Sequence, residues 1–271
     1  MDVNVILLIL AGFLGELLDS SLGMLYGTIL SPVLIIAGYD PLVVVPSILL
    51  TQAMAGFVAA IGHHRLRNAD FSVNNVVFKR GEDAGLINSL KRAMTRDSKV
   101  VLVVSALGIL ASIIAAVVAT SIPKAALNTY IGVLVLVMGA ILVSRSTFRF
   151  SWKKILGIGA ISAFNKGLSG GGFGPIVTAG QIISGRTSKS AIGATTLSEA
   201  PICIAGFFMY LLRNGMSTWH LVIFLGIGAI IGALVGPHIT AKLKSEKGVR
   251  VALGILVIAL GVWTLAKTWL L

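Results

Sequence analysis

The chain has 271 residues, of which 56% are hydrophobic and 12% charged, and its mean hydropathy is +0.96. Soluble domains carry about twice that charged fraction, so the composition excludes an ordinary soluble protein. The formal net charge of +12 would suit a nucleic-acid binder, but the basic residues lie in loops between apolar runs. That pattern indicates membrane topology, and no nucleic-acid partner is expected.

Apolar runs recur along the whole chain and predict an all-α polytopic membrane protein. Two pairs of runs are shorter than the roughly 20 residues that span a bilayer. A break rich in glycine and polar residues joins each pair, at residues 19–32 and 165–175. The predicted segments are residues 3–18, 24–38, 42–62, 100–122, 125–143, 155–164, 176–183, 191–212, 219–240 and 249–269.

The second half of the chain repeats the order of the first. The halves align without gaps at an offset of 147 residues over both breaks and the following helix. Each half has five segments, and an odd number gives the second half the opposite membrane orientation, so we expect an inverted repeat of residues 1–144 and 145–271. The equivalent pairs include Gly23 with Gly170, Gly27 with Gly174, Tyr26 with Phe173, Gln52 with Glu199 and Asp19 with Lys166.

The basic residues predict the orientation of the protein in the cell (inner or plasma) membrane. Eighteen Lys and Arg residues fall in loops that the predicted topology places on one side, against three on the other side. The positive-inside rule makes the basic side cytoplasmic, with both termini outside. The first segment lacks a basic leader and is therefore not expected to be a cleaved signal peptide. The cytoplasmic loops are residues 63–99, 145–154, 185–190 and 242–250.

The second break, N-K-G-L-S-G-G-G-F-G-P, sets a lysine and five glycines in an apolar context. Glycine costs about 1 kcal/mol per helical position, so the helix should end here. Helix N-termini, close backbone approach at glycine and the charge of Lys166 together favour a small anion as ligand. Tight helix packing through glycine is the structural alternative. The predicted substrate-binding residues are Asn165, Lys166, Ser169, Gly170, Gly171, Gly172 and Gly174, with Ser20, Ser21, Gly23, Tyr26 and Gly27 from the first break.

Four polar residues near the breaks, Asp19, Glu199, Glu16 and Gln52, are expected to handle charge or protons. Ionisable groups inside a membrane are usually paired or functional. Asp19 and Lys166 occupy equivalent positions and are predicted to form an ion pair, either permanent or opened during transport. Glu199 is predicted to accept a proton, with a hydrogen-bonded structural role as the alternative. Gln52 is its uncharged counterpart, and Glu16 lies one turn before Asp19 and could share its role.

No other motif indicates a different chemistry. Nucleotide-binding, zinc and nucleophile motifs are absent from the sequence, so no cofactor, metal or enzymatic activity is expected. The single cysteine, Cys203, forms no intrachain disulfide. Gly228, Gly232 and Gly236 favour close helix packing, within the chain or between subunits of a homo-oligomer. A channel-like uniporter, a membrane enzyme acting on a sulfur substrate and a membrane anchor binding a partner at residues 63–99 remain as alternatives.

These motifs also carry a family resemblance. L-D-S-S-L-G-M-L-Y-G at residues 18–27, H-H-R-L-R-N-A-D-F at 63–71 and S-G-G-G-F-G-P-I-V-T at 169–178 resemble the TauE/SafE sulfite exporter family, as does Ser198-Glu199. The resemblance implies movement of sulfite, a sulfonate, thiosulfate or a related organic anion, with the two breaks as the substrate region. We therefore expect a secondary transporter that works by alternating access around a site in mid-membrane.

Overall fold

The computed structural model describes residues 5–23, 25–73, 93–144, 152–183, 186–216, 219–243 and 247–270. Apart from an isolated bridge between Val73 and Met94, the regular structure there is helical, which confirms the all-α fold. Six helices are long and apolar enough to cross a membrane. The helices are α1 (Val5–Leu22), α2 (Tyr26–Ile36), α3 (Pro41–Arg65), α5 (Arg96–Ser121), α6 (Lys124–Ser144), α7 (Trp152–Ser169), α8 (Gly174–Ile183), α9 (Ser188–Asn214), α10 (Trp219–Lys242) and α11 (Lys247–Trp269).

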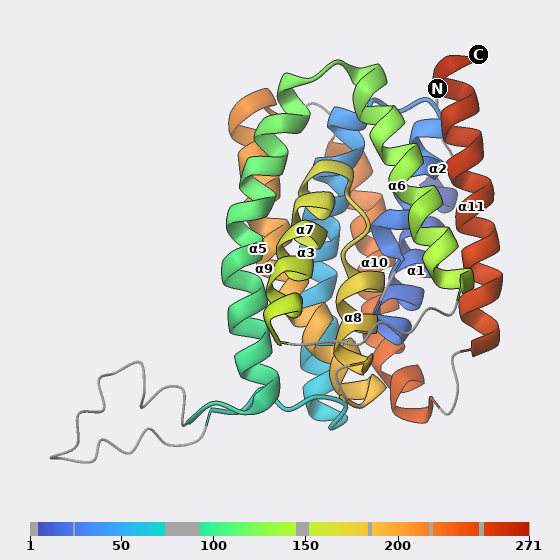
Figure 1. Ribbon diagram of the computed structural model, residues 1–271. Helices are drawn as coiled ribbons and strands as arrows, with labels where there is room; N and C mark the ends of the chain where they lie inside the picture. The colour runs from blue at the N-terminus through green and yellow to red at the C-terminus, as the bar shows by residue number, and fades with distance from the viewer. Residues whose placement is uncertain are drawn as a thin grey trace, which may run out of the picture.

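Both termini lie at one end of the molecule, and the end of α3 and the start of α5 lie at the other (Figure 1). We call these the terminal end and the α3–α5 end. Helix α1 begins and α2 ends at the terminal end, whereas α7 begins and α8 ends at the α3–α5 end (Figure 1). An inverted repeat requires this arrangement. The repeat itself and its boundary after residue 144 stay predictions.

The helices that precede the two breaks are longer than the sequence predicts. α1 continues to Leu22 and α7 to Ser169, so Asp19 and Lys166 lie in the last helical turns and not in loops. The expectation that the lysine and glycines end the helix at residue 164 is therefore wrong. Gly167 stays helical because it packs on α5, where an added Cβ would lie 2.7 Å from the Ser112 carbonyl oxygen. Tertiary packing here outweighs the low helix propensity of glycine.

The two breaks have positive φ angles at the same two equivalent positions. Gly23 and Gly170 have φ of 74° and 76°, and Leu25 and Gly172, two residues later, have φ of 104° and 80°. The first position ends each helix in the left-handed conformation that glycine adopts most easily, with its N–H bonded to the carbonyl four residues back. The correspondence at an offset of 147 residues thus extends from sequence to backbone geometry.

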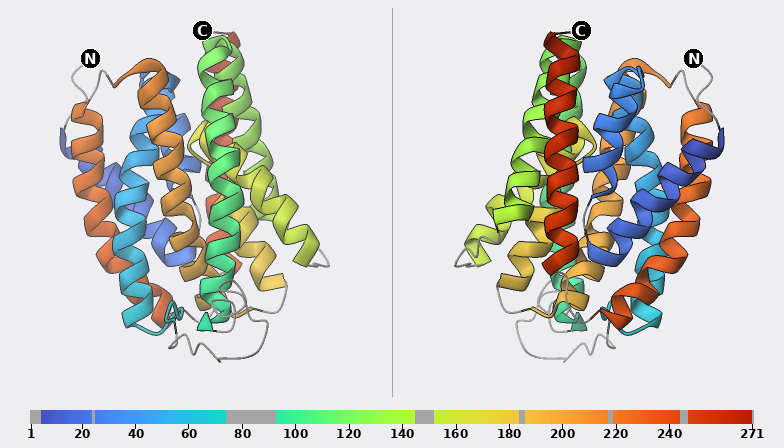
Figure 2. Two further views of the ribbon diagram at one scale, coloured as in Figure 1. Left: turned by 90° about the vertical axis from the view of Figure 1, so that its left-hand side faces the viewer. Right: turned by 90° about the vertical axis from the view of Figure 1, so that its right-hand side faces the viewer.

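Long helices surround the breaks in pairs. α1 packs along α10, α7 along α5, and α6 along α11, while α3 and α9 are in contact with each other (Figure 2). The α10 glycines belong to the first of these contacts. An added Cβ would lie 2.0 Å from the Ile9 oxygen at Gly228, 2.6 Å from the Phe13 oxygen at Gly232 and 2.0 Å from Ser20 Oγ at Gly236. The glycine stripe therefore serves packing within the chain.

Candidate functional site

The two breaks cross each other in direct backbone contact. A Cβ added at Gly27 would lie 1.5 Å from the Gly170 carbonyl oxygen, and one added at Gly171 would lie 2.8 Å from the Thr28 nitrogen. Real side chains do not fit at such distances, so glycine is required at both positions. The contact places the start of α2 against the loop between α7 and α8.

Three hydroxyl groups fasten the crossing. Each joins one break to the helix that follows the other break, so the two short helix pairs are held together at their turns. The N–H of Gly172 donates to Thr28 Oγ1 at 3.1 Å, Ser31 donates to the Ser169 carbonyl, and Thr178 donates to the Gly23 carbonyl at 2.8 Å. Ser31 and Thr178 are themselves equivalent at the 147-residue offset.

A chain of charged and polar groups lies beside the crossing. Lys166, 1% exposed, forms an ion pair with Glu199, with Nζ 2.8 Å from Oε1. The same amine donates to the side-chain oxygen of Gln52. The Gln52 amide donates in turn to Asp19 Oδ2 at 3.1 Å, and Asp19 Oδ1 accepts the N–H of Tyr26 at 3.0 Å. The series Glu199–Lys166–Gln52–Asp19 therefore connects α9, α7, α3 and α1.

The predicted ion pair between Asp19 and Lys166 is wrong. Each of the two residues bonds the residue 33 positions later in its own half, Asp19 with Gln52 and Lys166 with Glu199. Gln52 accepts from the lysine and donates to the aspartate, so the amide lies between the two charges. Of the four residues predicted to handle charge, Asp19, Gln52 and Glu199 are joined to Lys166 in one hydrogen-bonded series. The pairs within that series differ from the predicted pair.

Three backbone donors at the breaks are already occupied in this conformation. The Tyr26 N–H at the start of α2 is bound by Asp19, and the Gly171 N–H is bound by Ser169 Oγ at 3.1 Å. Gly172 is bound by Thr28. An anion could reach these three groups only by displacing a protein acceptor, and at Lys166 it would compete with Glu199 and Gln52. The arrangement is a closed site with its own carboxylates in place.

Glu16 is the one member of the predicted charge group that stands outside this chain of bonds. It is fully buried, and within the described part of the protein neither carboxylate oxygen has a hydrogen-bond partner. Its Cβ lies against α10 at Gly232. A charged carboxylate that loses its hydration without gaining a donor is costly. Glu16 is therefore a natural place for a proton in the buried cluster.

Comparison with known proteins identifies the family. Residues 84–264 match the family model described as Sulfite exporter TauE/SafE. The chain belongs to this family. The probable membrane transporter protein YtnM of Bacillus subtilis (strain 168) is 23% identical over 273 residues, covering 96% of this chain and 82% of the relative. No solved structure gives a significant match. The family and this relative indicate a multi-pass membrane transporter rather than an enzyme.

Several residues predicted to bind substrate are bonded to other groups of this TauE/SafE protein. Asn165 accepts from the hydroxyl of Tyr130 on α6. Ser20 donates to the Glu16 carbonyl at 2.6 Å, and Ser21 donates to the Leu18 carbonyl at 3.3 Å, both in their own helix. In this conformation these three side chains are engaged in bonds to the surrounding helices, and their role in binding substrate stays a prediction.

Other residues near the TauE/SafE site were missed from the sequence. The Tyr26 hydroxyl lies 2.8 Å from Thr51 Oγ1 on α3. Thr28, Ser31 and Thr178 hold the breaks together. The sequence offered one sign of these contacts: Ser31 and Thr178 both carry a hydroxyl at equivalent positions of the two halves. Both positions are buried in the structure.

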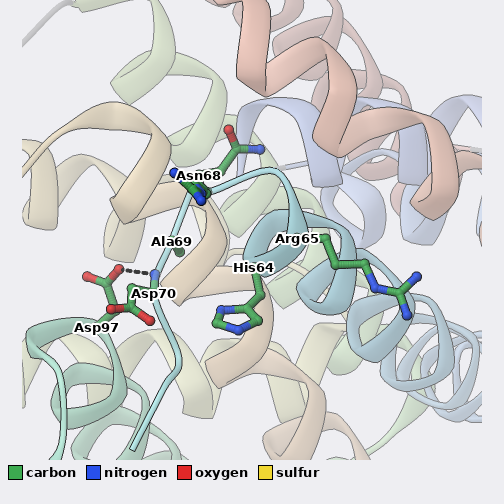
Figure 3. A pocket seen from close by; sticks show the side chains of 7 residues that line it. His64, Arg65, Asn68, Ala69, Asp70 and Asp97 are labelled. Carbon is green, nitrogen blue, oxygen red and sulfur yellow. Dashed lines mark hydrogen bonds between the residues drawn. The ribbon is translucent and has the colours of Figure 1, made fainter. Parts of the chain in front are cut away.

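A second polar region of the TauE/SafE chain lies at the α3–α5 end, where a pocket of about 650 Å³ opens (Figure 3). Within it, Asp97 Oδ2 accepts the N–H of Asp70 at 2.7 Å. The Ser72 N–H, 3.0 Å from Asp70 Oδ1, lowers the pKa of that exposed carboxyl. The lining residues are His64, Arg65, Arg67, Asn68, Ala69, Asp70 and Asp97.

Proposed function

We propose that the protein is a secondary transporter that moves a small anion, such as sulfite, a sulfonate, thiosulfate or a related organic anion, across the cell membrane. One observation carries the proposal: the amine of Lys166 is buried where two broken helices cross in backbone contact. Broken helices of this kind form ion and substrate sites in membrane transporters. Packing alone would require the glycines but not the lysine.

The charges of the cluster suggest how an anion binds. The buried groups near the crossing comprise one lysine and three carboxylates, those of Glu16, Asp19 and Glu199, and adding an anion to this set is unfavourable unless protons enter as well. We infer that the anion replaces Glu199 on Lys166 while a proton is taken up by Glu199 or Glu16. Anion movement would then be coupled to protons, and rocking of the two halves about the crossing would alternate the access.

The proposed orientation places the α3–α5 end in the cytoplasm and both termini outside. Arg65, Arg67, Arg96 and Arg186 lie at or beside helix ends on the α3–α5 side, whereas Lys124 begins α6 at the terminal end. Such an asymmetry of basic residues supports the orientation. We further propose residues 1–144 and 145–271 as the two repeats that move against each other.

Thermal unfolding of the purified protein in the presence of sulfite, sulfate, thiosulfate or methanesulfonate tests the proposal. A bound anion raises Tm by mass action. Lys267→Met is the matched control, because Lys267 binds the Ile36 carbonyl at 2.6 Å at the end of α2. We expect one anion to stabilise the parent and the Lys267 variant but not a Lys166→Met/Glu199→Gln variant, which removes both buried charges together.

An equal rise in Tm for that double variant would overturn the assignment of the site. Flux in reconstituted vesicles then separates the transporter from a channel-like uniporter. We expect flux that saturates with anion concentration and is accompanied by proton movement, and a linear flux without proton movement would favour the uniporter.

A further inference from the structure

Polar side chains form a hydrogen-bonded route from the α3–α5 end to the centre. At its outer end Arg186, which follows α8, is paired with Asp97 of α5. The guanidinium also donates to the side-chain oxygen of Gln181 on α8. Ser190, in the first turn of α9, bonds the same aspartate at 2.6 Å. Arg186 is 6% exposed, so a full charge is buried at the mouth of this route.

The inner part of the route consists of an amide and two hydroxyls. Gln181 Nε2 donates to Thr195 Oγ1 at 2.8 Å. Thr178 Oγ1 lies 3.0 Å from Thr195 Oγ1 and 2.8 Å from the Gly23 carbonyl oxygen at the first break. Thr195 is one helical turn before Glu199, on the same face of α9. The route therefore ends one turn from the ion pair of Lys166.

Among the described residues of the first half, the positions equivalent to Gln181 and Thr195 are apolar. At the offset of 147 residues, Gln181 corresponds to Leu34 and Thr195 to Ile48. Leu34 is 3% exposed and Ile48 is fully buried, and both belong to the main hydrophobic core. Buried apolar side chains thus replace the amide and one of the two hydroxyls of the route, while Ser31 keeps the other hydroxyl. Polarity at these positions distinguishes the two halves although the φ angles of the breaks are alike.

Asp97 stands between the pocket and Arg186. The aspartate lines the pocket of about 650 Å³ (Figure 3), and its side chain is 12% exposed against 2% for Arg186. Arg65 and Arg67 bring positive charge to the same pocket, which the carboxylates of Asp70 and Asp97 also line. A guanidinium binds a carboxylate and a small oxyanion through the same planar set of donors. An arriving anion can therefore exchange with Asp97.

We propose that a small anion enters from the α3–α5 end by replacing Asp97 on Arg186, and then passes along Gln181, Thr195 and Thr178 to the central site. The inference rests on the proposed function for the identity of the solute as an anion. Arg186 then serves as an outer binding site, and Asp97 is its exchangeable counter-ion. The amide and hydroxyl donors replace part of the anion's hydration along the way.

Side-resolved thiol labelling in sealed vesicles tests the route without requiring transport. In a Cys203→Ala background, Thr178→Cys is compared with Ser31→Cys, its equivalent in the first half. The probe is an impermeant sulfonated methanethiosulfonate, with a trimethylammonium analogue as the charge control. Asp70→Cys, at an exposed position, reports which face of the vesicle carries the α3–α5 end. Thr195→Cys provides a second position on the route.

We expect Thr178→Cys to react from the α3–α5 face at least about tenfold faster with the anionic than with the cationic reagent. Asp97→Asn should raise that rate and Arg186→Gln should lower it, while Ser31→Cys should stay unreactive from either face. Equal rates at positions 31 and 178, or no labelling of Thr178→Cys and Thr195→Cys in the Asp97→Asn protein, would overturn the inference.

The outcomes also separate this inference from the proposed function. Labelling as expected without any anion-dependent rise in Tm would leave the route standing and remove the assignment of the central site. A rise in Tm that depends on Lys166, together with labelling only from the terminal face, would leave the proposed function standing and refute this route.

Discussion

The first and second breaks have similar φ angles but differ in chemistry. Gly23 and Gly170 turn the chain with nearly the same φ, yet the helix before the first break carries Asp19 and the helix before the second carries Lys166. The partner residues differ in the same sense, an amide in Gln52 and a carboxylate in Glu199. At these equivalent positions the backbone φ values are alike, whereas the side chains before and after the breaks differ in charge.

The backbone contact between the breaks should be one of the most sensitive parts of the molecule. Gly27→Ala places a Cβ on the Gly170 carbonyl, and only a backbone shift can relieve that contact. We expect a loss of about 3 kcal/mol or more, seen as little folded protein or a sharply lower Tm in detergent. Gly157→Ala is the control, because no described atom lies within 4 Å of the added Cβ. Similar stability of the two variants would contradict the backbone contact.

Removing the charge on one side only should have an effect of similar size. Lys166→Met leaves the Glu199 carboxylate buried without its cation, which costs about 3–5 kcal/mol. Adding Glu199→Gln should restore most of that stability, because the uncompensated charge is gone. The measurement is the free energy of unfolding of both variants in detergent. Failure of the second substitution to recover stability would mean that the lysine acts through packing and not through charge.

The hydroxyl contacts that join the breaks are expected to contribute less. Thr28→Val removes the acceptor for the Gly172 N–H, and Thr178→Val removes the donor to the Gly23 carbonyl. Each should lower the free energy of unfolding by about 1–3 kcal/mol, because a buried polar group loses its partner. Equal losses would show that the two joints are equivalent. If only one of the two variants loses stability, only one of the two hydrogen bonds contributes to the stability of the crossing.

The smallest effect is expected at the exposed ion pair between Lys124 and Asp40 at the terminal end. The lysine side chain is 63% exposed, against 1% for Lys166. Lys124→Ala should change the free energy of unfolding by no more than about 1 kcal/mol. Added salt should remove the effect, whereas the Lys166 variants should respond little to salt. A large loss of unfolding free energy in Lys124→Ala that does not depend on salt would contradict the expected difference between buried and exposed ion pairs.

Sequence reasoning located both breaks, the internal correspondence and three residues bonded into one series with Lys166. It failed on the pairing, since an internal alignment gives equivalence and not proximity. Two equivalent residues meet only if they lie on the axis that relates them, and Asp19 and Lys166 instead bond the helix that follows in their own half. The helix ends were also misplaced, because the packing of Gly167 on α5 is a tertiary contact without a local signal.

The bare crossing of Gly27 and Gly171 has a consequence for redesign. Because the two segments are in backbone contact there, no substitution at those positions can alter which solute the protein accepts. A change in solute preference has to come from side chains around the contact, such as Thr28, which binds Gly172, and Gln52, which binds Lys166. A set of variants designed to bind new solutes should keep the two glycines and change the side chains around them.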